Sequence, residues 1–170
     1  MTLAITRLCL VRHGETAWNA EGRVQGQTDV PLNAVGTAQA DAVGAVLAGE
    51  RFTAIYSSDL TRVRQTAEPA AQRLGLPIRY DAALRERHYG MFETRTYAEV
   101  REIFPEDYAR FRKKELDYDF RGGESLRRFN QRALGCVRAL AGRHAGETIL
   151  VFTHGGVLDM VYRTALGLPL

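Results

Sequence analysis

The 170-residue chain is predicted to fold as an α/β protein: a three-layer, doubly wound, mostly parallel sheet with helices on both faces and a small helical cap insertion. Short apolar segments alternate with segments of helical spacing, and this alternation implies right-handed crossovers between parallel strands. At this length about 70% of the unfolded surface can be buried without a disulfide or a metal. One domain spanning residues 1–170 is therefore expected.

Four short apolar segments are the candidate strands. The first, Arg7–Val11, is apolar and leads into Gly14, which predicts a fully buried strand. The other three are Ala54–Ser57, Ile78–Tyr80 and Thr148–Phe152. Because ligands of open parallel sheets bind at the carboxyl ends of the strands, residues that follow these segments are candidates for a site.

Helical spacing and capping residues predict four helices. The first begins at Pro31–Asn33, ends at Gly49, and is expected to bury one face made of Val35, Ala38, Ala42, Val46 and Leu47. The second has Ser58–Asp59 as its N-cap and ends at Gly75. A long helix opens after Gly122–Ser125, with an apolar face of Leu126, Phe129, Ala133, Val137 and Leu140, and a last helix covers Val157–Leu166.

Residues 89–121 differ in character from the rest of the chain. They are dense in charged and aromatic side chains, and Pro105 interrupts their helical stretches. This segment is expected to form the cap insertion over the sheet edge. Its aromatic residues either shape a partly apolar pocket or simply pack the cap onto the sheet; they are Tyr97, Phe104, Tyr108, Phe111, Tyr118 and Phe120.

The composition favours a small anionic ligand. There are 23 Lys and Arg against 20 Asp and Glu, a formal net charge of +3. Lys113 and Lys114 are the only lysines, so nearly all the positive charge is guanidinium, which suits bidentate contacts with phosphate or carboxylate. Genomic base composition is an alternative source of the same bias.

The cysteines and the N-terminal segment indicate a cytoplasmic protein. Cys9 and Cys136 are far apart and lack paired spacing, as expected of small buried side chains in a reducing compartment rather than metal ligands. Thr6 and Arg7 interrupt the apolar segment Leu3–Val11, which therefore predicts neither a signal peptide nor a membrane span.

Polar residues follow three of the predicted strands. Arg12 and His13 follow the first, Ser57 and the nearby Arg62 belong to the second, and His154 follows the last. Arginine matches phosphate oxygens, and histidine is the side chain best able to act as a neutral nucleophile near pH 7. A convergence of these side chains in one crevice indicates phosphate chemistry; the alternative is that each is an isolated strand-end residue.

The ordered motifs resemble the histidine phosphatase superfamily, the phosphoglycerate mutase-like group, and within it the phosphatase branch of small bacterial-type members. The segments that carry the resemblance are Leu10–Asn19, Ser57–Ala67, Leu84–Glu86, Gly123–Ser125 and Thr153–Gly156. They run from the first predicted strand to the last helix. The order of the whole set is far more specific than any single motif.

The resemblance implies a role for each matching residue. His13 would attack phosphorus and become a transient phosphohistidine, while Arg12, Arg62 and His154 would hold the phosphoryl oxygens. Further substrate or phosphate contacts would come from Asn19, Gln25, Gly26 and Gly155, although Gln25 and Gly26 also fit a plain loop role.

Two carboxylates compete for the role of general acid and base. Glu86 resembles the family's proton donor, whereas Glu15, although adjacent to the nucleophile, is expected to stabilise the loop. No metal and no other cofactor is expected, because two arginines and a second histidine supply positive charge and no carboxylates cluster to hold an ion. The same guanidinium groups are expected to keep His13 neutral.

The predicted function is that of a metal-independent phosphatase, a phosphomonoesterase acting on a small phosphorylated metabolite. Phosphoglycerate mutase-type transfer and a non-catalytic phospholigand-binding module are the alternatives. A nucleic-acid binder is disfavoured because its arginines recur at varied spacings rather than as one stripe: Arg121, Arg127, Arg128, Arg132 and Arg138. A zinc hydrolase is disfavoured because no ligand pair has the required spacing.

Two departures from the family's pattern weaken inference about the substrate. Glu93-Thr94 stands where many relatives have Glu-Gly, so the local turn is expected to differ. The sequence also stops at Leu170, where relatives continue into another strand and a tail; either the member is short or the C-terminal strand and tail are missing. An uncovered edge strand would favour pairing in a homodimer.

Overall fold

The computed structural model describes residues 4–170, so Leu3 and the first residues of the predicted domain lie outside the described part. The strands are β1 (Arg7–Arg12), β2 (Ala54–Ser57), β3 (Ile78–Tyr80) and β4 (Thr148–Thr153). The α-helices are α1 (Ala17–Ala20), α2 (Ala34–Leu47), α3 (Thr61–Leu74), α4 (Tyr97–Ile103), α5 (Pro105–Arg112), α6 (Leu126–Arg143) and α7 (Gly155–Ala165). Two 3₁₀ helices, η1 (Ala82–Leu84) and η2 (Gly90–Phe92), precede α4.

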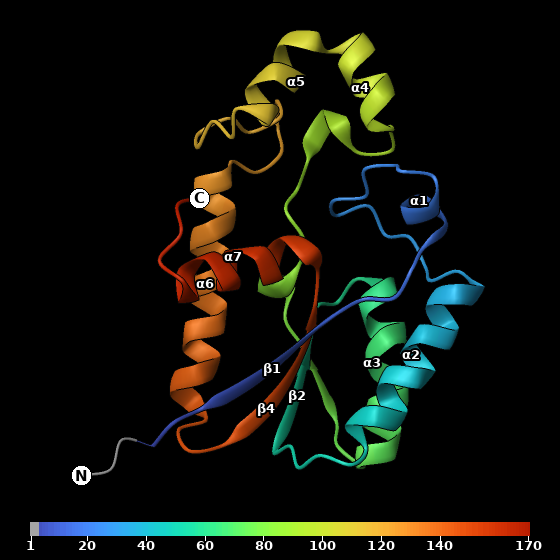
Figure 1. The fold of residues 1–170 in the computed structure, drawn as a ribbon, viewed down its shortest axis with the longest axis vertical. Helices are drawn as coiled ribbons and strands as arrows, with labels where there is room; N and C mark the ends of the chain where they lie inside the picture. The colour runs from blue at the N-terminus through green and yellow to red at the C-terminus, as the bar shows by residue number, and fades with distance from the viewer. Residues whose placement is uncertain (1–3) are drawn as a thin grey trace.

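The four strands form one parallel sheet in the order β1-β4-β2-β3 (Figure 1). Helices α2 and α3 cover one face, and α6 and α7 cover the other (Figure 1). The predicted three-layer α/β fold is confirmed. All four predicted strands are present, and each begins at its predicted first residue.

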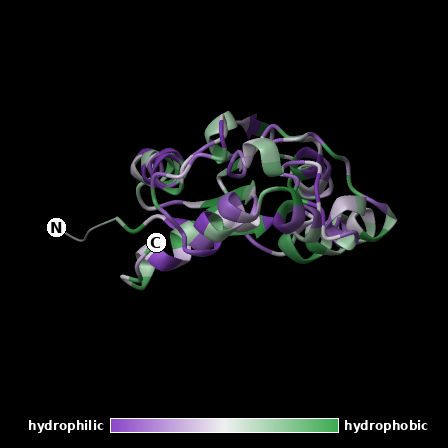
Figure 2. Cartoon of the chain, turned by 90° about the horizontal axis from the view of Figure 1, so that it is seen from above, coloured by the Kyte–Doolittle hydropathy of each residue, from purple (hydrophilic) through white to green (hydrophobic). Residues whose placement is uncertain are grey.

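Alternation along β4 divides the core into two layers. Leu150 and Phe152 pack with residues of α3, whereas Ile149 and Val151 pack with residues of α6. This is the period-2 pattern of a strand buried on both faces. Seen from above, hydrophilic and hydrophobic residues alternate along the outer helices, as expected of helices with one buried face (Figure 2).

The prediction that the first strand is fully buried is wrong. β1 is an edge strand that pairs only with β4, and its residues are half-buried or exposed. A short apolar run shows that both faces of a strand are covered, but it does not show how many neighbouring strands it has. Arg12, at the end of this edge, is exposed as a result.

The predicted buried face of the first helix is also wrong. Val35 and Val46 are exposed, at 53% and 76%. The face that packs against α3 is made of small residues, and its buried positions are Gly36, Ala40, Gly44 and Leu47. A Cβ on Gly44 would lie 3.0 Å from the backbone nitrogen of Ala70, so the two helices approach too closely for valine. Close helix contact outweighs hydrophobicity here.

The second helix begins two residues after its predicted N-cap. Thr61 is its first residue, and Leu60 provides no side-chain cap. Asp29 replaces the expected cap: its carboxylate accepts from the backbone N–H and the hydroxyl of Thr61, at 2.7 and 2.8 Å. A capping group from a distant loop leaves no local signal in the sequence. The helix ends at Gly75, as predicted, and this glycine adopts the left-handed conformation.

The segment between η1 and α6 lies beyond the carboxyl ends of the strands (Figure 1). Its aromatic side chains build a small core of their own with Val24, which belongs to the loop after α1. Phe92 and Phe120 are completely buried there, with ring centroids 4.9 Å apart. Most of these aromatics therefore pack the segment together and do not form a pocket.

Two glycines set the position of the loop that follows β1. Gly14 and Gly36 are in backbone contact, and a Cβ on Gly36 would overlap the carbonyl oxygen of Glu15. The N–H of Gly14 also donates to the hydroxyl of Thr66 on α3, at 3.0 Å. Helices α2 and α3 thus hold the residues that follow His13.

We expect Gly36→Ala to lower the free energy of unfolding by about 1–3 kcal/mol, because the new methyl group forces helix or loop to move. Gly135→Ala is the matched control: it lies exposed on α6 with no other group within 4 Å of its Cβ position. That change should stabilise by up to about 1 kcal/mol through helix propensity. Urea denaturation of both variants checks the expectation, which fails if Gly36→Ala is as stable as the unsubstituted protein.

Candidate active site

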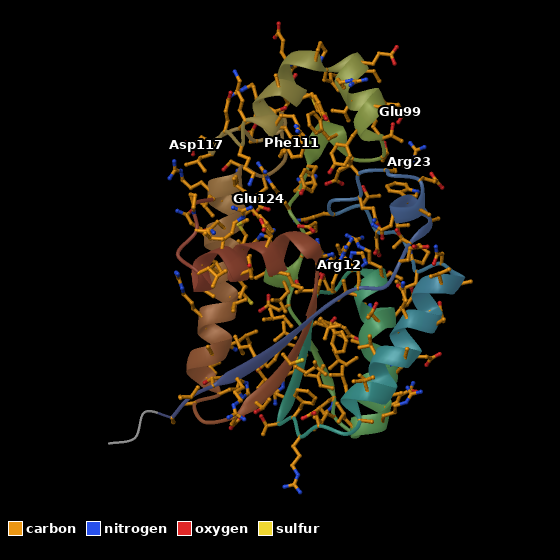
Figure 3. All side chains as sticks on the ribbon, in the orientation of Figure 1. Arg12, Arg23, Glu99, Phe111, Asp117 and Glu124 are labelled. Atoms are coloured by element: carbon orange, nitrogen blue, oxygen red, sulfur yellow. The ribbon has the colours of Figure 1, made fainter. Side chains whose placement is uncertain are left out.

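The carboxyl ends of three parallel strands bring the predicted site residues to one edge of the sheet. The N–H of His13 donates to the carbonyl of Thr153, and the N–H of Ser58 donates to the carbonyl of Phe152, both at 3.0 Å. The hydrogen-bonded ladder thus continues past the strands and fixes the backbone on which the side chains stand. Figure 3 shows Arg12 at this edge, between the sheet and the overlying segment.

His13 is a buried, neutral imidazole with one nitrogen available. Its Nδ1–H donates to the carbonyl of Gly14 at 2.8 Å, and since a carbonyl only accepts, Nε2 carries no proton. Burial lowers the pKa of His13 to about 4, opposed by the Gly14 contact, and the charges of Arg62 and Arg12 lower it further. The predicted neutral state agrees with this result, although burial contributes more than the arginines.

Arg62 is a buried guanidinium that donates to two backbone carbonyls and, at the longer distance of 3.4 Å, to Nδ1 of His154. It is 1% exposed and donates through Nη1 to Thr28 at 2.9 Å and through Nη2 to Gly26 at 2.7 Å. Its Nε is buried and has no hydrogen-bond partner among residues 4–170. Burial lowers its pKa, and the negative charges of Glu86, Asp29 and Glu93 oppose that shift. Positive charge with unused donor capacity is what an anion requires.

His154 lies behind His13, completely buried. The two ring centroids are 5.2 Å apart in an edge-to-face arrangement. Its Nδ1 is 3.4 Å from Nη2 of Arg62, which can only donate, so the proton is on Nε2 and points to the hydroxyl of Ser58 at 2.9 Å. Burial and the Arg62 charge hold the pKa of His154 well below its ordinary value.

Glu86 is half-buried, and two backbone N–H groups orient its carboxylate. The N–H groups of Gly156 and Arg87 donate to it at 2.9 and 2.8 Å. Burial raises its pKa, against the lowering effect of these two bonds and of the Arg62 and Arg12 charges. A Cβ on Gly156 would overlap the carboxylate, so this approach requires glycine. A carboxyl with a raised pKa can hold a proton for transfer.

Seven of the predicted site residues line one cavity of about 280 Å³: Arg12, His13, Asn19, Gln25, Gly26, Arg62 and Glu86. His154 and Gly155 lie outside its lining, and Gly155 packs beside Arg12, with its Cβ position 3.5 Å from Nε. Sequence reasoning missed further lining residues, which are Trp18, Gly22, Arg23, Val24 and Tyr89. Of the aromatic residues proposed for a pocket, only Tyr97 lines the cavity.

Asn19 and Gln25 line the cavity, and the side-chain oxygens of both accept hydrogen bonds from Thr16. The side-chain oxygen of Asn19 accepts from the N–H of Thr16 at 3.1 Å, within a capping box that orients α1. The side-chain oxygen of Gln25 accepts from the Thr16 hydroxyl at 3.0 Å. The amide nitrogens of Asn19 and Gln25 are the donors left for a ligand.

The sequence placed Ser57 among the site residues and Ser58 at a helix N-cap, whereas the structure brings Ser58 to the site. Ser57 donates to the carbonyl of Ser58 at 2.8 Å, and Ser58 is the residue that contacts His154. The doublet was a visible signal, but strand alternation alone did not show which hydroxyl faces the site. Glu15 accepts from the side chain of Asn33 at 2.8 Å, which matches its predicted role in the loop.

The arginines considered for nucleic-acid binding do not form a free basic stripe. Arg121, Arg127 and Arg132 pair with Asp107, Asp117 and Glu124 at 2.8, 2.7 and 2.7 Å. Arg132 also donates to the carbonyls of η1 and its C-terminal extension, at Ala83, Arg85 and Glu86. Its charge thus supports the backbone of the Glu86 segment.

Residues 4–170 contain no cluster of three or more His, Cys, Asp or Glu side chains that could hold a metal ion. Over the same described range, no helix has the length and apolar character needed to cross a membrane.

Residues 8–170 match the histidine phosphatase superfamily (branch 1), and the chain belongs to this family. It is 42% identical to phosphoglycerate mutase-like protein 4 of Arabidopsis thaliana, over 93% of this chain and 70% of that protein. It is 41% identical to the metal-independent phosphoserine phosphatase of the same plant, over 93% and 68%.

The fold agrees with a solved structure, Bacillus stearothermophilus YhfR, at a TM-score of 0.90 and 39% identity, covering 97% of this chain and 82% of that one. The family resemblance read from the motifs is confirmed. The predicted class of enzyme, a phosphatase, is confirmed as well.

Proposed function

We propose that the protein is a metal-independent phosphomonoesterase that acts on a small phosphorylated metabolite through a phosphohistidine at His13. The observation that carries the proposal is the neutral, buried His13, whose unprotonated Nε2 stands in a small cavity beside two arginines and Glu86, a carboxyl whose pKa burial raises. The name of one relative, a metal-independent phosphoserine phosphatase, supports the same reaction class.

In the first step, Nε2 of His13 attacks phosphorus and the bond from phosphorus to the leaving oxygen breaks. Glu86 gives its proton to that oxygen, so the product leaves as an alcohol. Arg12 and Arg62 hold the equatorial oxygens, where the charge of the transferring group resides. Two guanidinium groups thereby supply the positive charge that a magnesium ion supplies in other phosphoryl-transfer sites.

In the second step, water attacks the phosphohistidine. The oxygen of water bonds to phosphorus, the N–P bond breaks, and the Glu86 carboxylate takes the water's proton, which restores both residues. Asn19 and Gln25 donate to the phosphate from the cavity wall. His154 and Gly155 lie outside the cavity lining: His154 keeps the Arg62 guanidinium and the His13 ring in place, and Gly155 lies in ordinary contact with Arg12.

The cavity is lined on its outer side by Trp18, Arg23, Tyr89 and Tyr97, two of which belong to residues 89–121. We propose that residues 89–121 form the cap of a single domain, and that the residues of this segment that line the cavity select the leaving group. A cavity of about 280 Å³ has room for a small phosphorylated metabolite. The substrate would be a soluble compound of the cytoplasm.

We expect a brief reaction with ³²P-labelled phosphomonoester to place an alkali-stable, acid-labile label on His13. His13→Ala should abolish both the label and phosphate release. The matched control is His88→Ala, whose half-exposed ring lies outside the cavity and whose loss should leave labelling intact. Failure to label or to release phosphate across a broad panel of phosphomonoesters would favour a binding module. Transfer of the label to an acceptor metabolite would favour a mutase.

We expect Glu86→Gln to lower kcat by about 10²–10⁴-fold on alkyl phosphates, whose leaving oxygen needs a proton. The first step should be spared with p-nitrophenyl phosphate, whose leaving group departs without one, so phosphohistidine should accumulate. Rapid-quench measurement of the nitrophenol burst and of the label checks this expectation. Equal slowing of the burst with both kinds of substrate would contradict the role of Glu86 as proton donor.

A further inference from the structure

We infer that Glu93 is a positioning residue for Arg62, acting through the loop of residues 25–28. The inference rests on the proposed function, in which Arg62 holds the phosphoryl group. Glu93 follows η2, in the segment that forms the cap, and its side chain does not line the cavity. Its side chain is 10% exposed.

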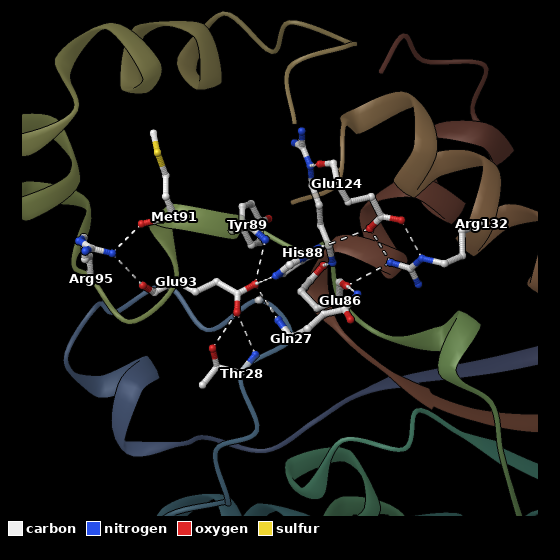
Figure 4. A network of polar contacts seen from close by, with 12 residues as sticks. Gln27, Thr28, Glu86, His88, Tyr89, Met91, Glu93, Arg95, Glu124 and Arg132 are labelled. Carbon is white, nitrogen blue, oxygen red and sulfur yellow. Dashed lines mark hydrogen bonds and ion pairs between the residues drawn. The ribbon is translucent and has the colours of Figure 1, made fainter. Parts of the chain in front are cut away.

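The carboxylate of Glu93 binds the loop at three points (Figure 4). Oε1 accepts from the N–H of Gln27 at 3.0 Å, and Oε2 accepts from the N–H and the hydroxyl of Thr28 at 3.1 and 2.7 Å. Oε1 also accepts from the N–H of Tyr89 at 2.9 Å, which anchors the carboxylate to its own segment. Both oxygens are used fully as acceptors, and a neutral amide cannot replace them because one of its two ends only donates.

The loop that Glu93 holds is the loop that holds Arg62. The carbonyls of Gly26 and Thr28 accept from Nη2 and Nη1 of the guanidinium, on either side of Gln27. Gly26 has a φ of +53°, and a Cβ there would overlap the Glu93 carboxylate, so loop and carboxylate are in direct contact. Arg62 forms no ion pair within residues 4–170, so these two carbonyls, with the longer contact from Nη2 to Nδ1 of His154 at 3.4 Å, are what orient it.

The same loop supports the proposed proton donor. The side-chain amide of Gln27 donates to the backbone carbonyl of Glu86 at 3.1 Å. One carboxylate in the cap therefore sets the position of the loop between the phosphate-holding arginine and the acid. Loss of Glu93 should act on the phosphate end of the substrate even though Glu93 itself touches neither phosphate nor leaving group.

Affinity for inorganic phosphate, measured by isothermal titration calorimetry, tests the inference without requiring turnover. Glu93→Gln should weaken phosphate binding about tenfold, since hydrogen bonds to a charged group are lost and the loop carbonyls shift. Glu102→Gln, exposed on the neighbouring helix α4, is the matched control and should leave the affinity unchanged. Glu93→Asp keeps both acceptor oxygens and should recover part of the affinity.

A double-mutant cycle separates positioning from general loss of structure. If Glu93 acts through Arg62, Glu93→Gln should change the affinity of an Arg62→Ala protein by less than about twofold, yet keep its full tenfold effect on an Arg12→Ala protein. Where Glu93→Gln does not fold, Thr28→Val removes only the hydroxyl contact and enters the same cycle, with an expected weakening of about threefold.

The outcomes distinguish the two proposals. The role of Glu93 is overturned, and the proposed function is not, if Glu93→Gln lowers phosphate affinity about tenfold in the Arg62→Ala protein. The same conclusion follows if Glu93→Gln as a single substitution leaves phosphate affinity unchanged. If Arg62→Ala itself leaves phosphate binding unchanged, the proposed function fails and the role of Glu93 fails with it.

Discussion

The site depends on the Arg62 guanidinium, which is buried and has no ion-pair partner in the part of the chain that the structure describes. Burial of an unpaired charge costs several kcal/mol unless hydrogen bonds and distant charges compensate. Arg62 donates hydrogen bonds to two backbone carbonyls of the loop before α2. The negative charges of Glu86, Asp29 and Glu93 attract the guanidinium from farther away. The compensation is partial, since burial still lowers the pKa of Arg62. A phosphate group would complete it.

The states of the neighbouring residues follow from this constraint. Burial, assisted by the nearby positive charge of Arg62, keeps the pKa of His13 and of His154 below the ordinary value, so both remain neutral. Burial acts in the opposite sense on the Glu86 carboxyl and raises its pKa. Desolvation thus shifts the two kinds of group in opposite senses within one cavity: it lowers the pKa of the His13 imidazole and raises the pKa of the Glu86 carboxyl.

Much of the fold was predictable from the sequence because period-2 and period-3.6 patterns report directly on buried faces. The four strands and the apolar face of α6 were found in this way. The failures have physical causes that sequence pattern does not carry. The α2–α3 contact uses Gly36, Ala40 and Gly44 in place of the valines, and α3 is capped by Asp29 from another loop.

The candidate site was likewise predictable from the sequence only in part. Motif residues such as Arg12, His13, Arg62 and Glu86 do line one cavity, because strand ends and motif positions predict shared location. The supporting residues were not predictable, since their contacts join distant parts of the chain. Ser58 was confused with its neighbour, Tyr89 was assigned to the cap without a contact, and Glu93 was noted only as a departure in the turn.

NMR titration of the His13 ring in the unliganded protein is the most direct test of the claim that the site keeps its nucleophile neutral. The account predicts a midpoint near pH 4 and, above it, a proton on Nδ1 alone. Because the unfolded chain binds this proton with the ordinary pKa of 6.5, the stability due to His13 should be complete above that pH and be lost as the pH falls toward about 4. An imidazolium that persists at or above pH 6.5, or a proton on Nε2, would contradict the account.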